Sequence, residues 1–362
     1  MQVVGAHTER RIIVPGKFDA LHIGHRELVR RAVAYGKPLI LSFSGMAQVL
    51  GKKPLLPIVA RSHMDLVIRS WCTAWQYDSV VSAAARPGQE AVLNTADFEV
   101  LVIPFAEIRH LSPEDFIVQY LYKELGARGI VCGWDWRFGY RAAGDVTLLE
   151  SLSERLETMS PDGWVFETVP PVLQDGEKVS SSRVRRYLAS GRVREAARML
   201  DRFHCTTARC LAIRNPDESL DLTVECWENQ PPASMRFYEC RVELQPMNFE
   251  RNGVPNPPRI RFDAYVWIGD TDQRSVESAH RSETFEYHPS RLRIWPVDRS
   301  DMHSQGIAVR VNGEMNTASI ALDRAMNESH SFEVVLEFRS LVTRPPKTGP
   351  SQRLSTARLV LE

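Results

Sequence analysis

The chain of 362 residues is too long for one typical domain and suits two. Hydrophobic residues make up 43% and charged residues 25%, and 45 basic side chains balance 45 acidic ones, so no net charge favours nucleic acid or an anionic membrane as a partner. No apolar run reaches the length of a membrane span and the polar start shows no secretory leader, so we expect a cytoplasmic protein. The six cysteines include no Cys-x-x-Cys pair, which predicts free thiols rather than structural zinc.

Strand-like and helix-like segments alternate over residues 11–200, a pattern that predicts a parallel, Rossmann-like α/β sheet. Ligands of such sheets bind beyond the carboxyl ends of the strands, so a site is expected just after residues 14 and 132. The expected strands are residues 11–14, 38–43, 79–82, 98–103 and 128–133. The expected helices are residues 25–35, 60–71, a segment opened by Ser112 and closed by Gly126, and another opened near residue 180.

Residues 17–25 are the first candidate phosphate site. A strand, a glycine-containing turn and a helix present backbone N–H groups and a positive helix end to an anion. His22 and His25 are three residues apart and share one face of the opening helical turn, where both imidazoles can donate hydrogen bonds to phosphate oxygens. The alternative is an ordinary strand-to-helix turn with a polar N-cap.

Residues 133–145 are a second candidate, because they hold three glycines, four aromatic rings, two arginines and two aspartates. Glycines let the backbone approach a ligand closely, and Asp135 is able to bond a ribose or help to hold a cation. The alternative is a surface turn whose rings are anchored in the core.

Residues 179–185 are the third candidate. Ser180, Ser181 and Ser182 precede a helix that carries Arg185 one turn in, and hydroxyls, backbone N–H groups and a guanidinium together grip a polyphosphate. The alternative is a good N-cap followed by solvated arginines.

In their order and spacing these segments resemble the adenylyltransferase half of the bacterial bifunctional flavin kinase/FAD synthetases, which are HxGH nucleotidyltransferases. The family motif Gly-x-Phe-Asp-Gly-x-His-x-Gly-His matches residues 16–25 with Ala20 for a glycine, and the central motif matches residues 112–145 with Trp136 for a phenylalanine. The closing motif Ile-Ser-Ser-Thr-x-Ile-Arg matches residues 179–185 with Ser182 for the threonine. The resemblance covers residues 11–203. It implies a domain over residues 1–203 that forms FAD and pyrophosphate from ATP and FMN with Mg²⁺.

The resemblance also implies roles for individual residues. The phosphate of FMN is already an anion and attacks the α-phosphate of ATP in line, so the rate depends on alignment and on charge neutralisation. The implied catalytic residues are His22, His25 and Arg185, and Asp135 is implied as the residue near the metal. The implied binding residues are Gly16, Lys17, Phe18, Asp19, Gly24, Gly133, Asp135, Arg137, Phe138, Gly139, Ser180, Ser181, Ser182 and Arg183.

One departure from the family keeps other functions open. The family has a Pro-His-Pro stretch after its second strand, whereas residues 44–47 read Ser-Gly-Met-Ala. This difference is compatible with another phosphate-bearing acceptor, or with a nucleotide-binding regulatory or scaffold protein that no longer turns over.

The second half, residues 204–362, changes character. Alternating runs predict an antiparallel barrel or sandwich with strands at 207–213, 220–227, 237–244, 259–268, 307–311, 318–322, 332–338 and 357–361. In the resembled family this place holds a riboflavin kinase barrel with a glycine-rich turn followed by Pro-Thr-Ala-Asn, and neither feature occurs here. A kinase barrel that has lost its chemistry remains open, but we favour a non-kinase module for protein contacts or oligomerisation.

Overall fold

A computed structural model of the chain describes residues 10–84, 98–214, 220–234, 236–247, 259–270, 290–296 and 331–342. The chain divides into two compact units, which we call unit 1 (residues 1–55 and 61–181) and unit 2 (residues 56–60 and 182–362). The domain boundary predicted between residues 203 and 204 therefore lies about twenty residues after the division between the units, and it stays a prediction.

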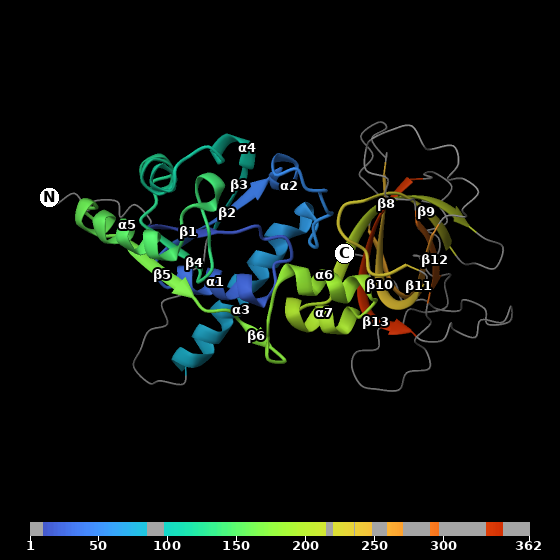
Figure 1. Ribbon diagram of the computed structural model, residues 1–362. Helices are drawn as coiled ribbons and strands as arrows, with labels where there is room; N and C mark the ends of the chain where they lie inside the picture. The colour runs from blue at the N-terminus through green and yellow to red at the C-terminus, as the bar shows by residue number, and fades with distance from the viewer. Residues whose placement is uncertain are drawn as a thin grey trace, which may run out of the picture. The chain divides into compact units, whose positions relative to one another are not determined.

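Unit 1 is built on a five-stranded parallel sheet in the order β3-β2-β1-β4-β5, which confirms the Rossmann-like class (Figure 1). The central strand β1 pairs with β2 on one side and with β4 on the other, so the predicted segments that follow β1 and β4 lie at neighbouring strand ends. The strands are β1 (Arg11–Pro15), β2 (Lys37–Ser44), β3 (Glu99–Pro104), β4 (Gly129–Gly133) and β5 (Val165–Val169).

Helices connect these strands, and a small hairpin follows β5. Among the described residues, no helix combines the length and apolar character that crossing a membrane requires. The helices are α1 (Ile23–Val33), α2 (Met46–Val49), α3 (Arg61–Ala84), α4 (Phe105–Ile108), the π-helix η1 (Asp115–Glu124), the 3₁₀ turn η2 (Tyr140–Ala142) and α5 (Val146–Met159). The hairpin consists of β6 (Leu173–Gln174) and β7 (Glu177–Lys178).

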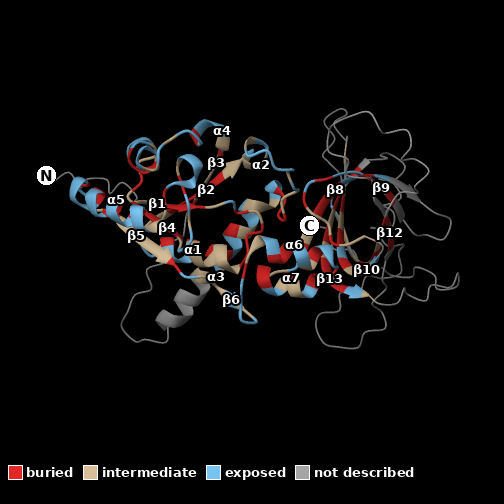
Figure 2. Cartoon of the chain, in the orientation of Figure 1, coloured by how far each residue is buried: buried red, intermediate tan, exposed pale blue. Residues whose placement is uncertain are grey.

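Local chemistry explains where the helices of unit 1 begin. The side chain of Ser112 accepts a hydrogen bond from the backbone N–H of Asp115 at 3.0 Å ahead of η1, as predicted, and Asp145 caps α5 through the N–H of Leu148 at 3.0 Å. Buried side chains of the sheet, η1 and α5 share one core, in which Ile13 and Ile117 are fully buried. Figure 2 shows the buried stretches of these strands and helices in red.

The strand predicted at residues 79–82 is wrong, because these residues belong to the last turns of α3. Val80 and Val81 favour a strand only weakly, since β-branching lowers helix propensity slightly. A helix that has already formed adds one hydrogen bond for each residue it fixes, so extending α3 is favourable despite this local preference.

Unit 2 combines two helices with a closed antiparallel barrel, which confirms the all-β prediction and decides between barrel and sandwich. The barrel order is β10-β11-β12-β9-β8-β13, whereas the strands predicted at 307–311, 318–322 and 357–361 lie outside the described residues. The elements are α6 (Ser181–Ala189), α7 (Val193–Leu200), β8 (His204–Arg214), β9 (Leu220–Trp227), β10 (Arg236–Pro246), β11 (Ile260–Asp270), β12 (Ser290–Pro296) and β13 (Ser331–Val342).

The described strands of the barrel carry many buried residues (Figure 2), and most of these are apolar. Tyr238 and Phe338 are fully buried and meet edge to face with their ring centroids 5.2 Å apart.

All six cysteines of the chain are free thiols, as predicted. Burial raises the pKa of Cys132, on β4, to about 12.

His204, at the start of β8, predicts how the stability of unit 2 depends on pH. The side chain is buried, its Nε2 bonds the carbonyl oxygen of Gln230 at 2.8 Å, and burial lowers the pKa of His204 to about 4. An unfolded histidine titrates near pH 6.5, so on acidification the unfolded state binds the proton first. The stability that unit 2 gains by burying the neutral ring is therefore complete above pH 6.5 and is lost as the pH falls toward 4.

We expect the free energy of unfolding to fall by about 2–3 kcal/mol between pH 7 and pH 4.5 because of this one group. Denaturant titrations at both pH values, made on the natural chain and on His204→Gln, measure the effect. Between these pH values the natural chain should lose about 2–3 kcal/mol more stability than the variant. An equal loss in both proteins contradicts a lowered pKa of His204.

Candidate active site

The turn between β1 and α1 is held in an unusual backbone conformation. Phe18 and Leu21 have φ angles of +48° and +47°, and both side chains are fully buried. Such angles are costly for residues other than glycine and persist only where packing holds them, which is common at functional sites. The N–H of Gly16 donates to Leu41 O at 3.0 Å and Ser42 Oγ donates to Lys17 O at 3.1 Å, so β2 also fixes the turn.

This turn brings His22 and His25 together. His22 is the N-cap of α1, and its Nδ1 accepts the backbone N–H of His25 at 3.3 Å. The two rings lie nearly parallel with their centroids 3.8 Å apart, and the His25 ring lies 5.0 Å from that of Phe18. Because Nδ1 of His22 is an acceptor, the neutral ring carries its proton on Nε2, and this N–H is a hydrogen-bond donor.

The other residues predicted in this turn differ in their exposure and in what they contact. A Cβ atom on Gly24 would lie 3.1 Å from both Nδ1 and Cε1 of His22, so glycine leaves room for the imidazole. Lys17 is exposed and Asp19 half-buried, and both are accessible to a ligand. Phe18 is fully buried and its ring contacts the His25 ring, so packing is the role of its side chain.

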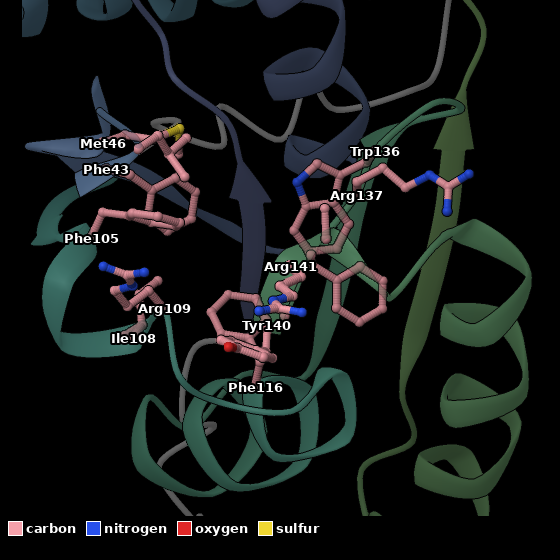
Figure 3. Close-up of a pocket in the computed structure, with 14 residues that line it drawn as sticks. Phe43, Met46, Phe105, Ile108, Arg109, Phe116, Trp136, Arg137, Tyr140 and Arg141 are labelled. Atoms are coloured by element: carbon pink, nitrogen blue, oxygen red, sulfur yellow. The ribbon is translucent and has the colours of Figure 1, made fainter. Parts of the chain in front are cut away.

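A cavity of about 460 Å³ opens in unit 1 (Figure 3). Phe43 at the end of β2 and Phe105 on α4 meet edge to face, whereas Trp136 and Phe138, after β4, stack with their centroids 4.7 Å apart. Aromatic walls of this kind accept a flat, largely apolar ligand. The lining residues are Phe43, Met46, Leu50, Phe105, Ile108, Arg109, Phe116, Trp136, Arg137, Phe138, Gly139, Tyr140, Arg141 and Ala142.

Three guanidinium groups accompany these rings. Arg137 pairs with Asp145 at 3.4 Å, and Arg141 lies over the Tyr140 ring with its guanidinium carbon 5.3 Å from the centroid. Within the part of the chain that the structure describes, neither Arg109 nor Arg141 forms an ion pair with an acidic side chain. The pocket therefore suits a planar ligand that also carries an anionic group.

The sequence identified only part of this pocket. Arg137, Phe138 and Gly139 were predicted and line it, and Trp136 belongs to the predicted motif. Phe43 and Phe105 were missed because single apolar residues at strand ends resemble ordinary core positions, and Arg109 was missed because a lone arginine resembles a solvated surface residue. The altered stretch at residues 44–47 was the one available signal for the opposite wall, and its Met46 does line the pocket.

Gly139 predicts how sensitive the pocket loop is to substitution. Its φ is +71°, and a Cβ there would lie 2.6 Å from the Cα and N atoms of Pro113. Gly126 is a matched control, with a φ of +65° and nothing within 4 Å. We expect Gly139→Ala to lower the free energy of unfolding by about 2 kcal/mol more than Gly126→Ala. Both substitutions place alanine at an unfavourable positive φ, but only the new Cβ at residue 139 clashes with backbone atoms. Equal losses in denaturant unfolding contradict this.

Asp135 forms an ion pair with Lys178. Its Oδ2 accepts a hydrogen bond from Lys178 Nζ on the β6–β7 hairpin, and the same ammonium lies 5.8 Å from the ring centroid of Trp134. Among the described residues no group of three or more His, Cys, Asp or Glu side chains is placed to hold a metal ion. The assignment of Asp135 to a metal stays a prediction, and its ion pair with Lys178 argues against that assignment.

The third predicted segment begins at the division between the two units. Ser180 and Ser181 belong to unit 1, whereas Ser182, Arg183 and Arg185 belong to unit 2. Arg183 is buried and donates to Tyr187 OH at 3.3 Å, and Arg185 donates through Nη1 to Oε1 of Gln230. Arg185 and the two histidines thus lie in different units, and their convergence on one triphosphate stays a prediction.

The fold and the site define a Rossmann-like α/β protein with a paired-histidine turn suited to phosphate and an aromatic pocket on the same sheet. A family model described as FAD synthetase matches residues 87–183. FAD synthetase 1, chloroplastic, from Arabidopsis thaliana is 36% identical over 287 residues, which are 76% of this chain and 74% of that protein. The chain belongs to the FAD synthetase family.

Two further comparisons delimit this likeness. FAD synthetase 2, chloroplastic, from Arabidopsis thaliana is 38% identical over 220 residues, which are 58% of this chain and 54% of the relative, so the chain spans about half of that protein. The solved structure of a macrolide-efflux protein from Streptococcus pneumoniae covers 95% of this chain and 89% of its own, with a TM-score of 0.57 and 17% identity. The structural likeness shows a shared fold alone.

Proposed function

We propose that the chain transfers the adenylyl group of ATP to FMN, giving FAD and pyrophosphate. The observation that carries the proposal is the aromatic pocket with its arginines, which lies in the same unit as the paired-histidine turn. An isoalloxazine ring is flat, with an apolar dimethylbenzene end and π faces that stack on aromatic side chains, and FMN also carries a phosphate, so the pocket matches both parts of this acceptor. Membership of the FAD synthetase family supports the same reaction.

The reaction requires alignment more than acid–base chemistry. A phosphate oxygen of FMN attacks the α-phosphorus of ATP, a new P–O bond forms, and the bond to the bridging oxygen breaks with its electron pair leaving on pyrophosphate. The attacking oxygen is already anionic, so no general base is needed. Nε2–H of His22 and the His25 imidazole are proposed to donate to the phosphates as charge gathers on the leaving group.

The proposed roles of the third segment complete the ATP site. The serines at 180–182 and Arg185 are proposed to bind the β- and γ-phosphates, where a guanidinium can donate two hydrogen bonds to one phosphate. Support comes from the position of the serines at the start of α6, whose first N–H groups lack helical partners.

Magnesium is proposed only as the ion that ATP carries on its phosphates. Asp135 pairs with Lys178, and the described residues hold no cluster of three metal-ligating side chains, so these residues do not fit a resident metal ion. No step of the proposed reaction depends on such an ion.

We propose that unit 2 does not phosphorylate riboflavin. The sequence lacks the glycine-rich turn and Pro-Thr-Ala-Asn element of the resembled kinases, and apolar side chains fill the described barrel interior. We also propose that the protein works in a reducing compartment such as the cytoplasm, which its six free thiols support. Cell fractionation followed by immunodetection tests the location.

An acceptor screen with the full chain tests the proposed activity. ATP and Mg²⁺ are supplied with FMN, with riboflavin or with another phosphate-bearing acceptor, and the release of pyrophosphate and the flavin products are measured. Pyrophosphate release that depends on FMN and yields FAD supports the proposal. Release with another acceptor alone, or ATP binding without release, refutes it, and FMN formed from riboflavin refutes the absence of a kinase.

A further inference from the structure

The connection between β9 and β10, residues 228–234 of unit 2, is held by a buried amide. Asn229 is fully buried, and its Nδ2 donates to Ile58 O and to Cys205 O, each at 2.8 Å. Its Oδ1 accepts the backbone N–H of Thr207 at 2.9 Å. Every polar atom of this side chain is therefore bonded to backbone, so the connection is fixed to β8 and to the segment 56–60.

The next residue, Gln230, is fixed through its own backbone. Its N–H donates to Pro57 O at 2.8 Å and its carbonyl oxygen bonds Nε2 of His204 at 2.8 Å. The side chain then extends to α6, where Oε1 accepts a hydrogen bond from Nη1 of Arg185. Because the backbone on either side of Cα is bonded, the amide oxygen is presented to Arg185 from a rigid base.

A second contact ties the same connection to α6. The N–H of Ala233 donates to Leu188 O at 2.8 Å, and Tyr238 OH donates to Ala233 O at 2.8 Å. Arg185 and Leu188 both belong to α6, so the connection is hydrogen-bonded to this helix at two positions, one turn apart.

We propose that Gln230 is a positioning residue for nucleotidyl transfer, and that through it the barrel unit orients Arg185 for the phosphates of ATP. This inference rests on the proposed function. An amide oxygen suits the task, because it fixes the direction of a guanidinium without cancelling its positive charge, as a carboxylate would. The barrel is then a part of the transferase rather than a separate module.

Steady-state kinetics of the full chain test the proposal. Gln230→Met keeps the length of the side chain and removes the acceptor, and it should raise the KM for ATP about tenfold while the KM for FMN stays within about twofold. Gln230→Glu keeps an acceptor, but its carboxylate compensates the positive charge of Arg185. This variant should therefore raise the KM for ATP at least as much as Gln230→Met does. Gln119→Met, at an exposed position of η1, is the matched control and should change neither KM.

A double-mutant cycle separates the possible failures. In an Arg185→Ala background, Gln230→Met should change kcat/KM for ATP less than about twofold, because the two residues act as one. If Arg185→Ala lowers activity but Gln230→Met does not, or if the two effects multiply, Gln230 has no positioning role and the proposed function stands. If Arg185→Ala leaves activity unchanged, the proposed role of Arg185 fails as well.

Thermal unfolding of each variant accompanies the kinetics. If Gln230→Met does not fold, Gln230→Glu decides, because it retains an acceptor for Arg185. A folded Gln230→Glu with the KM for ATP of the natural chain overturns the proposal.

Discussion

Replacing His25 with alanine is expected to lower the rate of FAD formation at least about tenfold. The imidazole lies parallel to that of His22 at the start of α1, where the proposed reaction gathers negative charge on the leaving pyrophosphate. Removing one preorganised donor to a developing charge commonly costs about a hundredfold in kcat. The loss should appear in kcat more than in the KM for ATP, because the donor acts most strongly in the transition state.

His63→Ala is the matched control for this substitution. His63 lies on α3, outside the β1–α1 turn, and is partly exposed. The control should keep its turnover, and both variants should unfold at temperatures close to that of the natural chain. A His25→Ala protein that folds and retains full turnover contradicts the assignment of the histidine pair to catalysis.

Trp136→Leu is expected to raise the KM for FMN at least about tenfold and to leave the KM for ATP unchanged. The indole is stacked on Phe138 and forms one wall of the aromatic pocket. Leucine preserves apolar character but has no flat face, and stacking of a heteroaromatic ring on an aromatic side chain contributes about 1–3 kcal/mol. Binding is measured without ATP through the quenching of FMN fluorescence, so the result does not depend on catalysis.

Trp134→Leu is the matched control in the same loop. Trp134 is two residues earlier, is 54% exposed and does not line the pocket. The KM for FMN should stay within about twofold of its natural value in this variant. An equal effect of both substitutions, or no effect of either, shows that the flavin does not use this pocket.

The sheet and the histidine turn could be predicted from sequence because their signals are local. Apolar runs of strand length between helical segments define a parallel α/β sheet, and a strand followed by glycine and paired histidines predicts a turn suited to phosphate within ten residues. The cap at Ser112 and the helix end at Gly126 are likewise set by residues close in the chain.

The pocket could not be predicted because its walls come from distant segments. Phe43 lies at the end of β2, whereas Phe105 follows β3 and Trp136 follows β4, and only the sheet order brings them together. Each aromatic residue alone is typical of a core position. The contact between Gln230 and Arg185 could not be predicted either, because these residues lie 45 positions apart on different segments of the chain.

ATP labelled in its α-phosphate, incubated with the full chain, FMN and Mg²⁺, tests the central claim most directly. Adenylyl transfer predicts that the label appears in FAD in equal amounts with unlabelled pyrophosphate, and that no label moves without FMN. Label that remains in ADP or AMP while the flavin stays unlabelled contradicts the reaction proposed here.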